Sequence, residues 1–164
     1  MSQMQEHIER LNRHIEQGTI IRRSWRGTDA QGRETVCLLA AMVPQCGETQ
    51  SARACPSQVM PLWLAFLTPR LDDNGSLAAW PGMVARFASL ASRWRVLDDA
   101  AWQRVQFVWL AAVVREAAAH TKEPDAAAVC ERVASLCDGV VTTAVIDQAA
   151  FDEARKAAEA AAAA

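Results

Sequence analysis

The longest uninterrupted apolar segment, residues 107–114 (FVWLAAVV), limits how this chain can fold. It lies in a segment that begins after the potential helix caps Asp98 and Asp99 and extends to about His120. A helix that is apolar on every face has to be surrounded by protein. Because a bilayer-spanning helix needs about 20 apolar residues, this run predicts the central buried helix of a globular protein, without a membrane span.

The rest of the chain reads mainly as helices separated by turns. Residues 19–33 are the exception, because they combine β-favouring residues with turn residues and favour a short strand or hairpin. Pro44 is expected to end the helix that is predicted over residues 34–43. For residues 35–39, a strand is an open alternative to this helix. Residues 72–76 (DDNGS) predict an exposed turn. The predicted helices cover residues 2–17, 34–43, 57–71, 76–95, 98–120, 124–137 and 147–164.

These elements predict an all-α fold of six to seven helices around the helix that contains residues 107–114, with room for one small β-hairpin near the N-terminus. The chain has 164 residues, of which 51% are hydrophobic and 22% charged, and this balance is typical of one globular domain spanning residues 1–164. The Ala-rich helix over residues 147–164 has little to anchor its end, so we expect fraying at residues 160–164.

The cysteine count and the N-terminal residues indicate the cellular compartment in which the protein is expected. The five cysteines are an odd number without CxxC pairs, which favours reduced, buried thiols over a disulfide framework. Residues 1–17 are polar with a thin apolar stripe and do not resemble a secretory signal. We therefore expect a cytoplasmic protein.

The first predicted helix carries an apolar seam with heptad spacing, formed by Met4, Ile8, Leu11 and Ile15. A seam of this kind packs either on its own domain or against a second copy of the chain. The sequence leaves both open, and the second alternative would make the seam a homodimer interface.

The densest basic cluster lies between Arg22 and Arg33 and has an aromatic residue within it, as in proteins that stack single-stranded nucleic acid. The net charge of -2 argues against a general affinity for nucleic acid. Arginine and tryptophan are also enriched at protein interfaces, so the same residues form a candidate interaction surface. This candidate surface comprises Arg22, Arg23, Trp25, Arg26 and Trp94.

Motifs of enzymes are missing from the sequence: it has no Gly-rich phosphate loop, GxSxG, HExxH or Cys/His pair at an informative spacing. We therefore predict no enzymatic activity, no catalytic or metal-binding residues and no cofactor.

Several short segments in the first two-thirds of the chain resemble uncharacterised proteins of bacterial phage or prophage origin. They are Trp25-Arg26, residues 34–41 (ETVCLLAA), Cys55-Pro56, residues 60–65 (MPLWLA) and Asp72-Asp73. The resemblance implies a genomic context and no activity. The sequence thus favours a non-catalytic accessory protein that binds another protein, and the alternative is a nucleic-acid-binding accessory protein that uses the Arg22–Arg33 segment.

Overall fold

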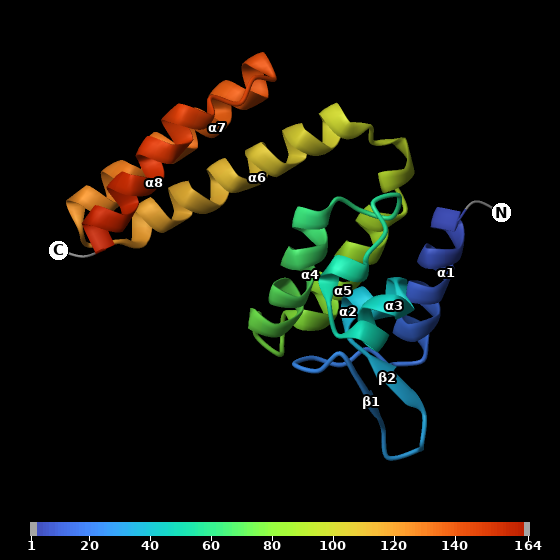
Figure 1. Cartoon of the computed structure of the whole chain (residues 1–164). Helices are drawn as coiled ribbons and strands as arrows, with labels where there is room; N and C mark the ends of the chain where they lie inside the picture. Colours follow the sequence, from blue (N-terminus) through green and yellow to red (C-terminus); the bar gives the residue numbers. More distant parts are fainter. Residues whose placement is uncertain (1–2, 163–164) are drawn as a thin grey trace. The chain divides into compact units, whose positions relative to one another are not determined.

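The computed structural model describes residues 3–162, with eight α-helices and one two-stranded hairpin in that range (Figure 1). The all-α prediction and the small N-terminal β element are confirmed. Contacts group the chain into two compact units, Met1–Val96 and Leu97–Ala164. The expected single domain stays a prediction because it depends on how the two units associate.

The first unit contains five α-helices, two short 3-10 helices and the hairpin. Strands β1 and β2 pair antiparallel, with Arg26 opposite Val36 and Thr28 opposite Glu34. Ile20 adds an isolated parallel bridge to Val36. The elements are α1 (Gln3–Glu16), β1 (Arg26–Thr28), β2 (Glu34–Val36), α2 (Leu38–Met42), α3 (Pro44–Thr49), η1 (Ala52–Ala54), α4 (Leu62–Asn74), α5 (Trp80–Ala91) and η2 (Trp94–Val96).

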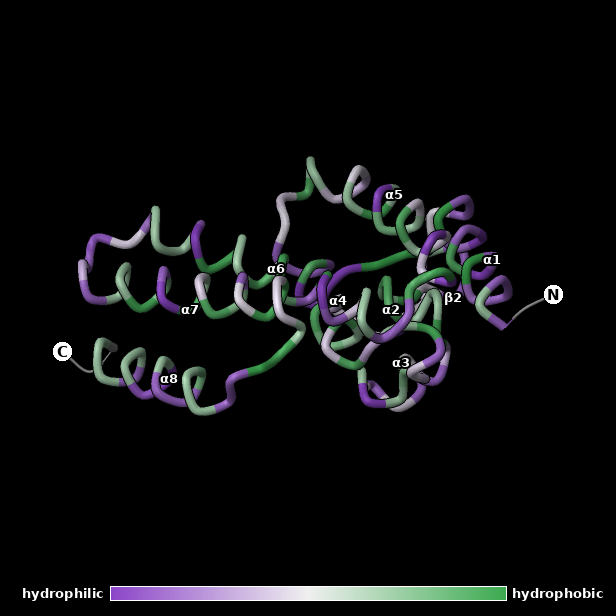
Figure 2. The backbone as a smooth tube through the Cα atoms, turned by 90° about the horizontal axis from the view of Figure 1, so that it is seen from above, coloured by the Kyte–Doolittle hydropathy of each residue, from purple (hydrophilic) through white to green (hydrophobic). Residues whose placement is uncertain are grey.

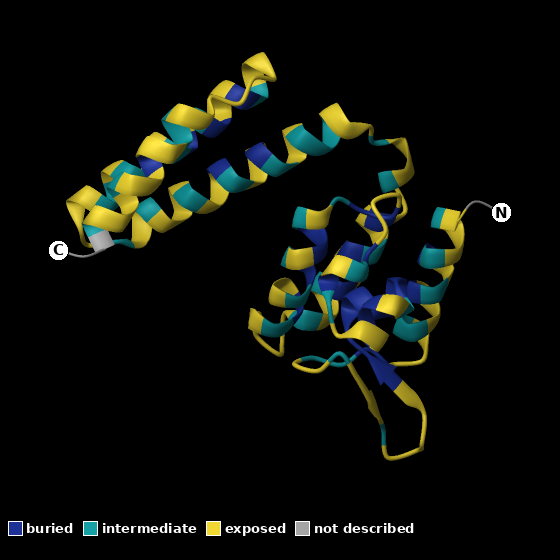
Figure 3. Cartoon of the chain, in the orientation of Figure 1, coloured by how far each residue is buried: buried dark blue, intermediate teal, exposed yellow. Residues whose placement is uncertain are grey.

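The core of the first unit is built around the short helix α2. Every residue of α2 is buried, and so is Val43, which follows it (Figure 3). Helices α1 and α4 both pack against α2, and α1 also contacts α5. The predicted helix over residues 34–43 is therefore wrong in its first half, where the alternative of a strand is partly confirmed by β2.

Pro44 starts the helix α3 as well as ending α2, whereas the sequence predicted only the end of a helix there. Val43 has φ −126° and ψ 91°, because a residue before proline avoids the α conformation, and this extended residue separates α2 from α3. Proline is favourable at the first position of α3, where its missing N–H would have no partner within the helix.

Helix α4 runs through the segment that the sequence predicts to be a turn. It continues past Pro69 to Asn74, and its buried face consists of Leu64, Ala65, Thr68 and Asp72. The Thr68 hydroxyl donates to the Leu64 carbonyl at 2.8 Å. The predicted exposed turn is thus wrong for Asp72 and Asp73, and the chain turns only after Asn74.

The second unit consists of α6 (Asp99–His120), α7 (Pro124–Thr143) and α8 (Gln148–Ala162). Asp98 caps α6 as predicted, because its carboxylate accepts the Ala101 N–H at 2.8 Å. Helices α6 and α7 pack along each other, and α8 packs on α7. The fraying expected at residues 160–164 stays a prediction, and residues 163–164 lie outside the described range.

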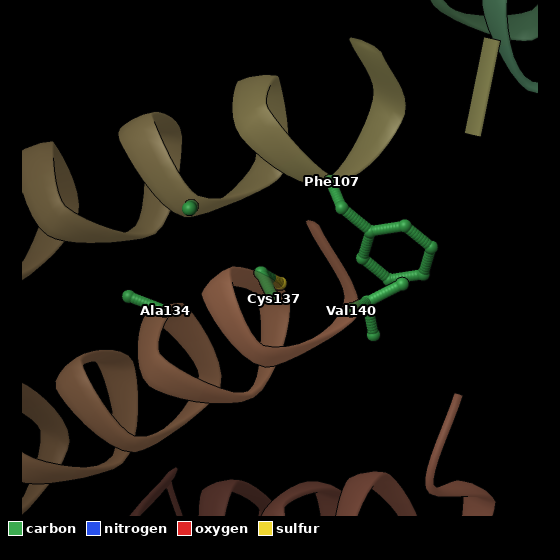
Figure 4. Packing of buried hydrophobic residues seen from close by; sticks show 5 residues of the cluster. Phe107, Ala134, Cys137 and Val140 are labelled. Atoms are coloured by element: carbon green, nitrogen blue, oxygen red, sulfur yellow. The ribbon is translucent and has the colours of Figure 1, made fainter. Parts of the chain in front are cut away.

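One face of α6 forms the core of the second unit together with small residues of α7. Phe107 and Ala111 of α6 pack with Ala134, Cys137 and Val140 of α7 (Figure 4). Ala134 and Cys137 have no exposed surface, so small side chains bring the two helices close together. At the exposed edge of the same pair, the Arg115 guanidinium forms a salt bridge with the Asp138 carboxylate.

The prediction that residues 107–114 are surrounded by protein on every face is wrong. Only Phe107 and Ala111 of α6 are buried, while Val108 and Val113 are exposed. The helix that is completely buried is α2, which is five residues long. Within residues 3–162, no helix is both long and apolar enough to cross a membrane.

Candidate functional site

Four large apolar side chains lie exposed on one side of α6: Val105, Val108, Trp109 and Val113. Val108 and Trp109 follow Val105 by three and four positions, and Val113 follows Trp109 by four, so the four residues lie on one helical face, opposite the face that packs on α7. Their exposed fractions lie between 37% and 52%. We call these four residues the outer face of α6. Soluble proteins rarely leave a continuous apolar patch in water unless it contacts something.

Sequence reasoning found the apolar character of this face but not its exposure. A run that is apolar all round predicts burial on all sides, and nothing in the run distinguishes the side that α7 covers from the other side. The signal lies in α7 instead, because its small and apolar residues at positions 133, 134, 137, 140 and 141 form only one stripe. One stripe covers one face of α6.

The predicted basic surface between Arg22 and Arg33 is largely occupied by local structure. The Arg22 guanidinium donates to three backbone carbonyls at the end of α4: Asp72 at 2.6 Å, Asp73 at 2.9 Å and Gly75 at 2.6 Å. It therefore caps α4, whose last carbonyls have no partners within the helix.

Two of the neighbouring arginines form contacts within the first unit, and a third is exposed to solvent. Arg26 forms a salt bridge with Glu34 across the hairpin. Arg33 forms one with Asp29 at 2.7 Å within the hairpin turn. The same guanidinium donates to the Gln17 carbonyl at 3.0 Å. Arg23 has an exposed side chain.

We expect Arg22→Ala to lower the free energy of unfolding by about 2 kcal/mol, because a charged donor to the carbonyls of α4 is lost. Arg22→Lys should recover only part of the loss, since one ammonium group cannot reproduce the planar guanidinium fork. Urea unfolding of the three proteins measures the effect. The matched control is Arg23→Ala, which should change stability by less than about 0.5 kcal/mol. Equal stability of all four proteins would contradict the capping role.

The two tryptophans of the predicted interaction surface are half-buried, whereas the sequence suggested an exposed pair. Trp94 packs edge-on against Phe87, with ring centroids 5.3 Å apart and an interplanar angle of 87°. Trp25 lines a pocket of about 230 Å³ beside Asp72 and Cys37. The five residues of the predicted surface therefore do not form one exposed patch, because their side chains serve different local contacts.

Asp72 is a fully buried carboxylate at this pocket. Its Oδ1 accepts the Trp80 indole N–H at 2.8 Å, and its Oδ2 accepts the Leu38 backbone N–H at 3.1 Å. Burial raises the pKa of Asp72, and the hydrogen bonds from Trp80 and Leu38 oppose that rise. Both carboxylate oxygens are thus engaged in holding α4 to α2 and to the start of α5.

The cysteines are consistent with the interpretation that they are small core residues. Four of the five are buried, and Cys130 is half-buried. Burial raises the pKa of Cys37 to about 11, so its thiol is neutral at physiological pH and is a poor nucleophile. Its Sγ caps α2 by accepting the Ala40 N–H at 3.4 Å.

The apolar seam of α1 packs inside its own unit. Leu11 has no exposed surface and Ile8 has 6%, while Met4 and Ile15 are half-buried. Figure 2 shows the corresponding alternation of hydrophilic and hydrophobic residues along α1. Of the two alternatives that the sequence left open, the structure shows packing on the chain's own domain. Met4, Ile8, Leu11 and Ile15 are therefore not an open dimer interface, because α2 and α5 already cover this helix.

Comparison of the chain with protein-family models, with curated proteins and with solved structures found no match. Among residues 3–162, no three His, Cys, Asp or Glu side chains come close enough together to hold a metal ion. The outer face of α6 is the feature of the described chain that calls most directly for a partner.

Proposed function

We propose that this protein is a non-catalytic accessory protein that binds another protein through the outer face of α6. The observation that carries the proposal is the exposure of Val105, Val108, Trp109 and Val113 on one face of a helix whose opposite face is packed. Val108 is the most exposed of the four side chains, which makes it the expected centre of the interface. The resemblance to phage or prophage proteins supports a bacterial cytoplasmic setting.

A charge placed on the outer face should abolish binding without unfolding the chain. In Val108→Glu/Val113→Glu, two carboxylates would have to lose their hydration on binding, which is costly when they have no partner. Affinity capture of the tagged full chain from the bacterium that carries the gene, after nuclease treatment, should yield a partner protein that this variant does not capture. The matched control is Leu77→Glu, which alters an exposed leucine of the first unit and should leave capture unchanged.

The stability of the same variant separates binding from folding. Because these side chains are exposed, the double variant should change the free energy of unfolding by no more than about 1 kcal/mol. A much larger loss would mean that the chain itself covers this face, and the proposal would fail. Capture that persists in the double variant would also overturn it. Light scattering tells whether the partner is a second copy of the chain, since a homodimer would then become monomeric in the variant.

Nucleic-acid binding through the Arg22–Arg33 segment stays the alternative from a different class. The capture experiment tests it as well, because material lost on nuclease treatment would favour it over a protein partner. Its affinity should then fall steeply with salt, since phosphate contacts release counterions.

A further inference from the structure

A second feature, in the first unit and independent of the outer face of α6, is a basic pocket of about 210 Å³ between α1, the hairpin and α3. Three side chains from the last turns of α1 line it: Arg10, Arg13 and His14. The hairpin contributes Arg26 and Glu34, and α3 contributes Glu48. Residues far apart in sequence therefore bring three guanidinium groups to one small cavity.

The cations of α1 act together at this pocket. Burial lowers the pKa of His14 most strongly, the Glu34 carboxylate opposes this shift, and the guanidinium groups of Arg10 and Arg13 lower the pKa further. Because His14 is lowered from an ordinary value of 6.5, it is mostly neutral at pH 7. It then offers the pocket a polar ring without adding a fourth positive charge.

The charges inside the pocket do not cancel. Glu34 is paired with Arg26 across the hairpin. This leaves Glu48 as the one further carboxylate in the lining, against Arg10 and Arg13. Arg10 donates one hydrogen bond to the Met42 carbonyl at 3.3 Å and keeps its remaining donors. Within residues 3–162, the Arg13 side chain has neither a hydrogen bond nor a salt bridge. An excess of guanidinium donors in a cavity is the chemistry that binds phosphate.

The cavity also has an apolar wall. Val36, Ala40 and Pro44 form this apolar part of the lining. A bare phosphate ion would leave this wall without a contact, whereas a phosphate ester with a small apolar group would cover it. We propose that this pocket binds a small phosphate monoester, with Arg13 and Arg10 holding the phosphate and the apolar wall holding the organic group.

Isothermal titration calorimetry of the full chain with phenyl phosphate tests the proposal. We expect saturable binding that is tighter than binding of inorganic phosphate, because only the ester reaches the apolar wall. Arg13→Gln should weaken the binding of phenyl phosphate by about tenfold or more, the usual effect of losing a charge-assisted hydrogen bond. The matched control is Arg93→Gln, an exposed arginine outside the pocket, which should bind like the unmodified protein.

Two further outcomes would overturn the site. One is the absence of saturable binding of phenyl phosphate to the unmodified protein. The other is an equal loss of affinity in Arg13→Gln and Arg93→Gln, which would indicate a diffuse attraction of anions to the surface. Arg13 is exposed, and in the described part of the chain its side chain forms no hydrogen bond or salt bridge, so the Gln variant should remain folded. Unchanged urea unfolding confirms this before the titration. Equal affinity for phenyl phosphate and inorganic phosphate would contradict the role of the apolar wall and reject the monoester.

Discussion

Phe107→Ala should lower the free energy of unfolding by about 3–5 kcal/mol, the usual cost of removing a large buried aromatic side chain. Phe107 is 8% exposed and fills the space between α6 and the end of α7 that carries Val140. Its ring also lies 6.0 Å from that of Phe151 in α8, centroid to centroid. One substitution therefore opens a cavity that all three helices of the second unit share.

Urea unfolding followed by far-ultraviolet circular dichroism measures this effect. The matched control is Val108→Ala on the outer face of the same helix, where the change should stay within about 0.5 kcal/mol. The contrast between neighbouring residues of one helix tests which face of α6 is packed. Similar losses at both positions would contradict the two-faced description of α6.

The second large effect is expected at Asp72, where Asp72→Ala should cost about 2–5 kcal/mol. The substitution leaves the buried Leu38 N–H and the Trp80 indole N–H without acceptors, and each unsatisfied donor costs about 1–3 kcal/mol. Asp72→Asn should lose less, because the amide oxygen can still accept one of the two donors. A matched control is Asp73→Asn, because the Asp73 carboxylate accepts, within residues 3–162, only the exposed Arg23 N–H. Unchanged stability of Asp72→Ala would show that this network does not hold the first unit together.

The pH dependence of stability gives a separate test of Asp72. Its pKa in the folded protein is raised above the ordinary value of 3.8, so the folded state binds the proton more tightly than the unfolded state does. The contribution of this group to stability is therefore complete below pH 3.8 and declines as the pH rises through the raised pKa. The difference in unfolding free energy between the unmodified protein and Asp72→Asn should shift against the unmodified protein in that window. A flat difference would contradict the raised pKa.

Local rules predicted most of the secondary structure, because they depend on neighbouring residues. The seam of α1 has the spacing of a helix packed on one side, and Asp98 is a good N-cap. The small β element followed from β-favouring residues next to turn residues. These features need no knowledge of what lies across the core.

Contacts between residues far apart in the sequence determine the features of the fold that local patterns did not predict. Asp72 stands in a run of turn-forming residues, which local rules place in solvent. Its true environment follows from the spacing of Leu64, Thr68 and Asp72, which places the aspartate on the buried face of a helix. The aspartate is tolerated on this buried face because Leu38 and Trp80, which belong to other elements, donate their N–H groups to its carboxylate. The Arg22 cap is similar, since its three carbonyls lie about 50 positions away along the chain.

The candidate surface was the least predictable part. The sequence concentrated attention on the arginines near the hairpin, whose guanidinium groups turned out to hold the hairpin and the end of α4. It also treated residues 107–114 as uniformly buried. One side of α6 is packed because α7 covers it, and the other side is exposed because α7 does not reach it. This difference depends on tertiary packing, which the sequence of α6 does not show.

The division of the chain at Leu97 has a consequence for its synthesis. Each unit is one continuous stretch, so no strand or helix of the first unit has to wait for residues made after Val96. The nascent first unit can close around α2 while the ribosome is still translating the second unit, since compact parts of a chain fold during translation. The second unit then needs mainly contacts between helices that follow one another directly, the kind of topology that assembles quickly, together with the contact of Phe151 in α8 with Phe107 in α6. The apolar outer face of α6 would thus emerge after the first unit has folded.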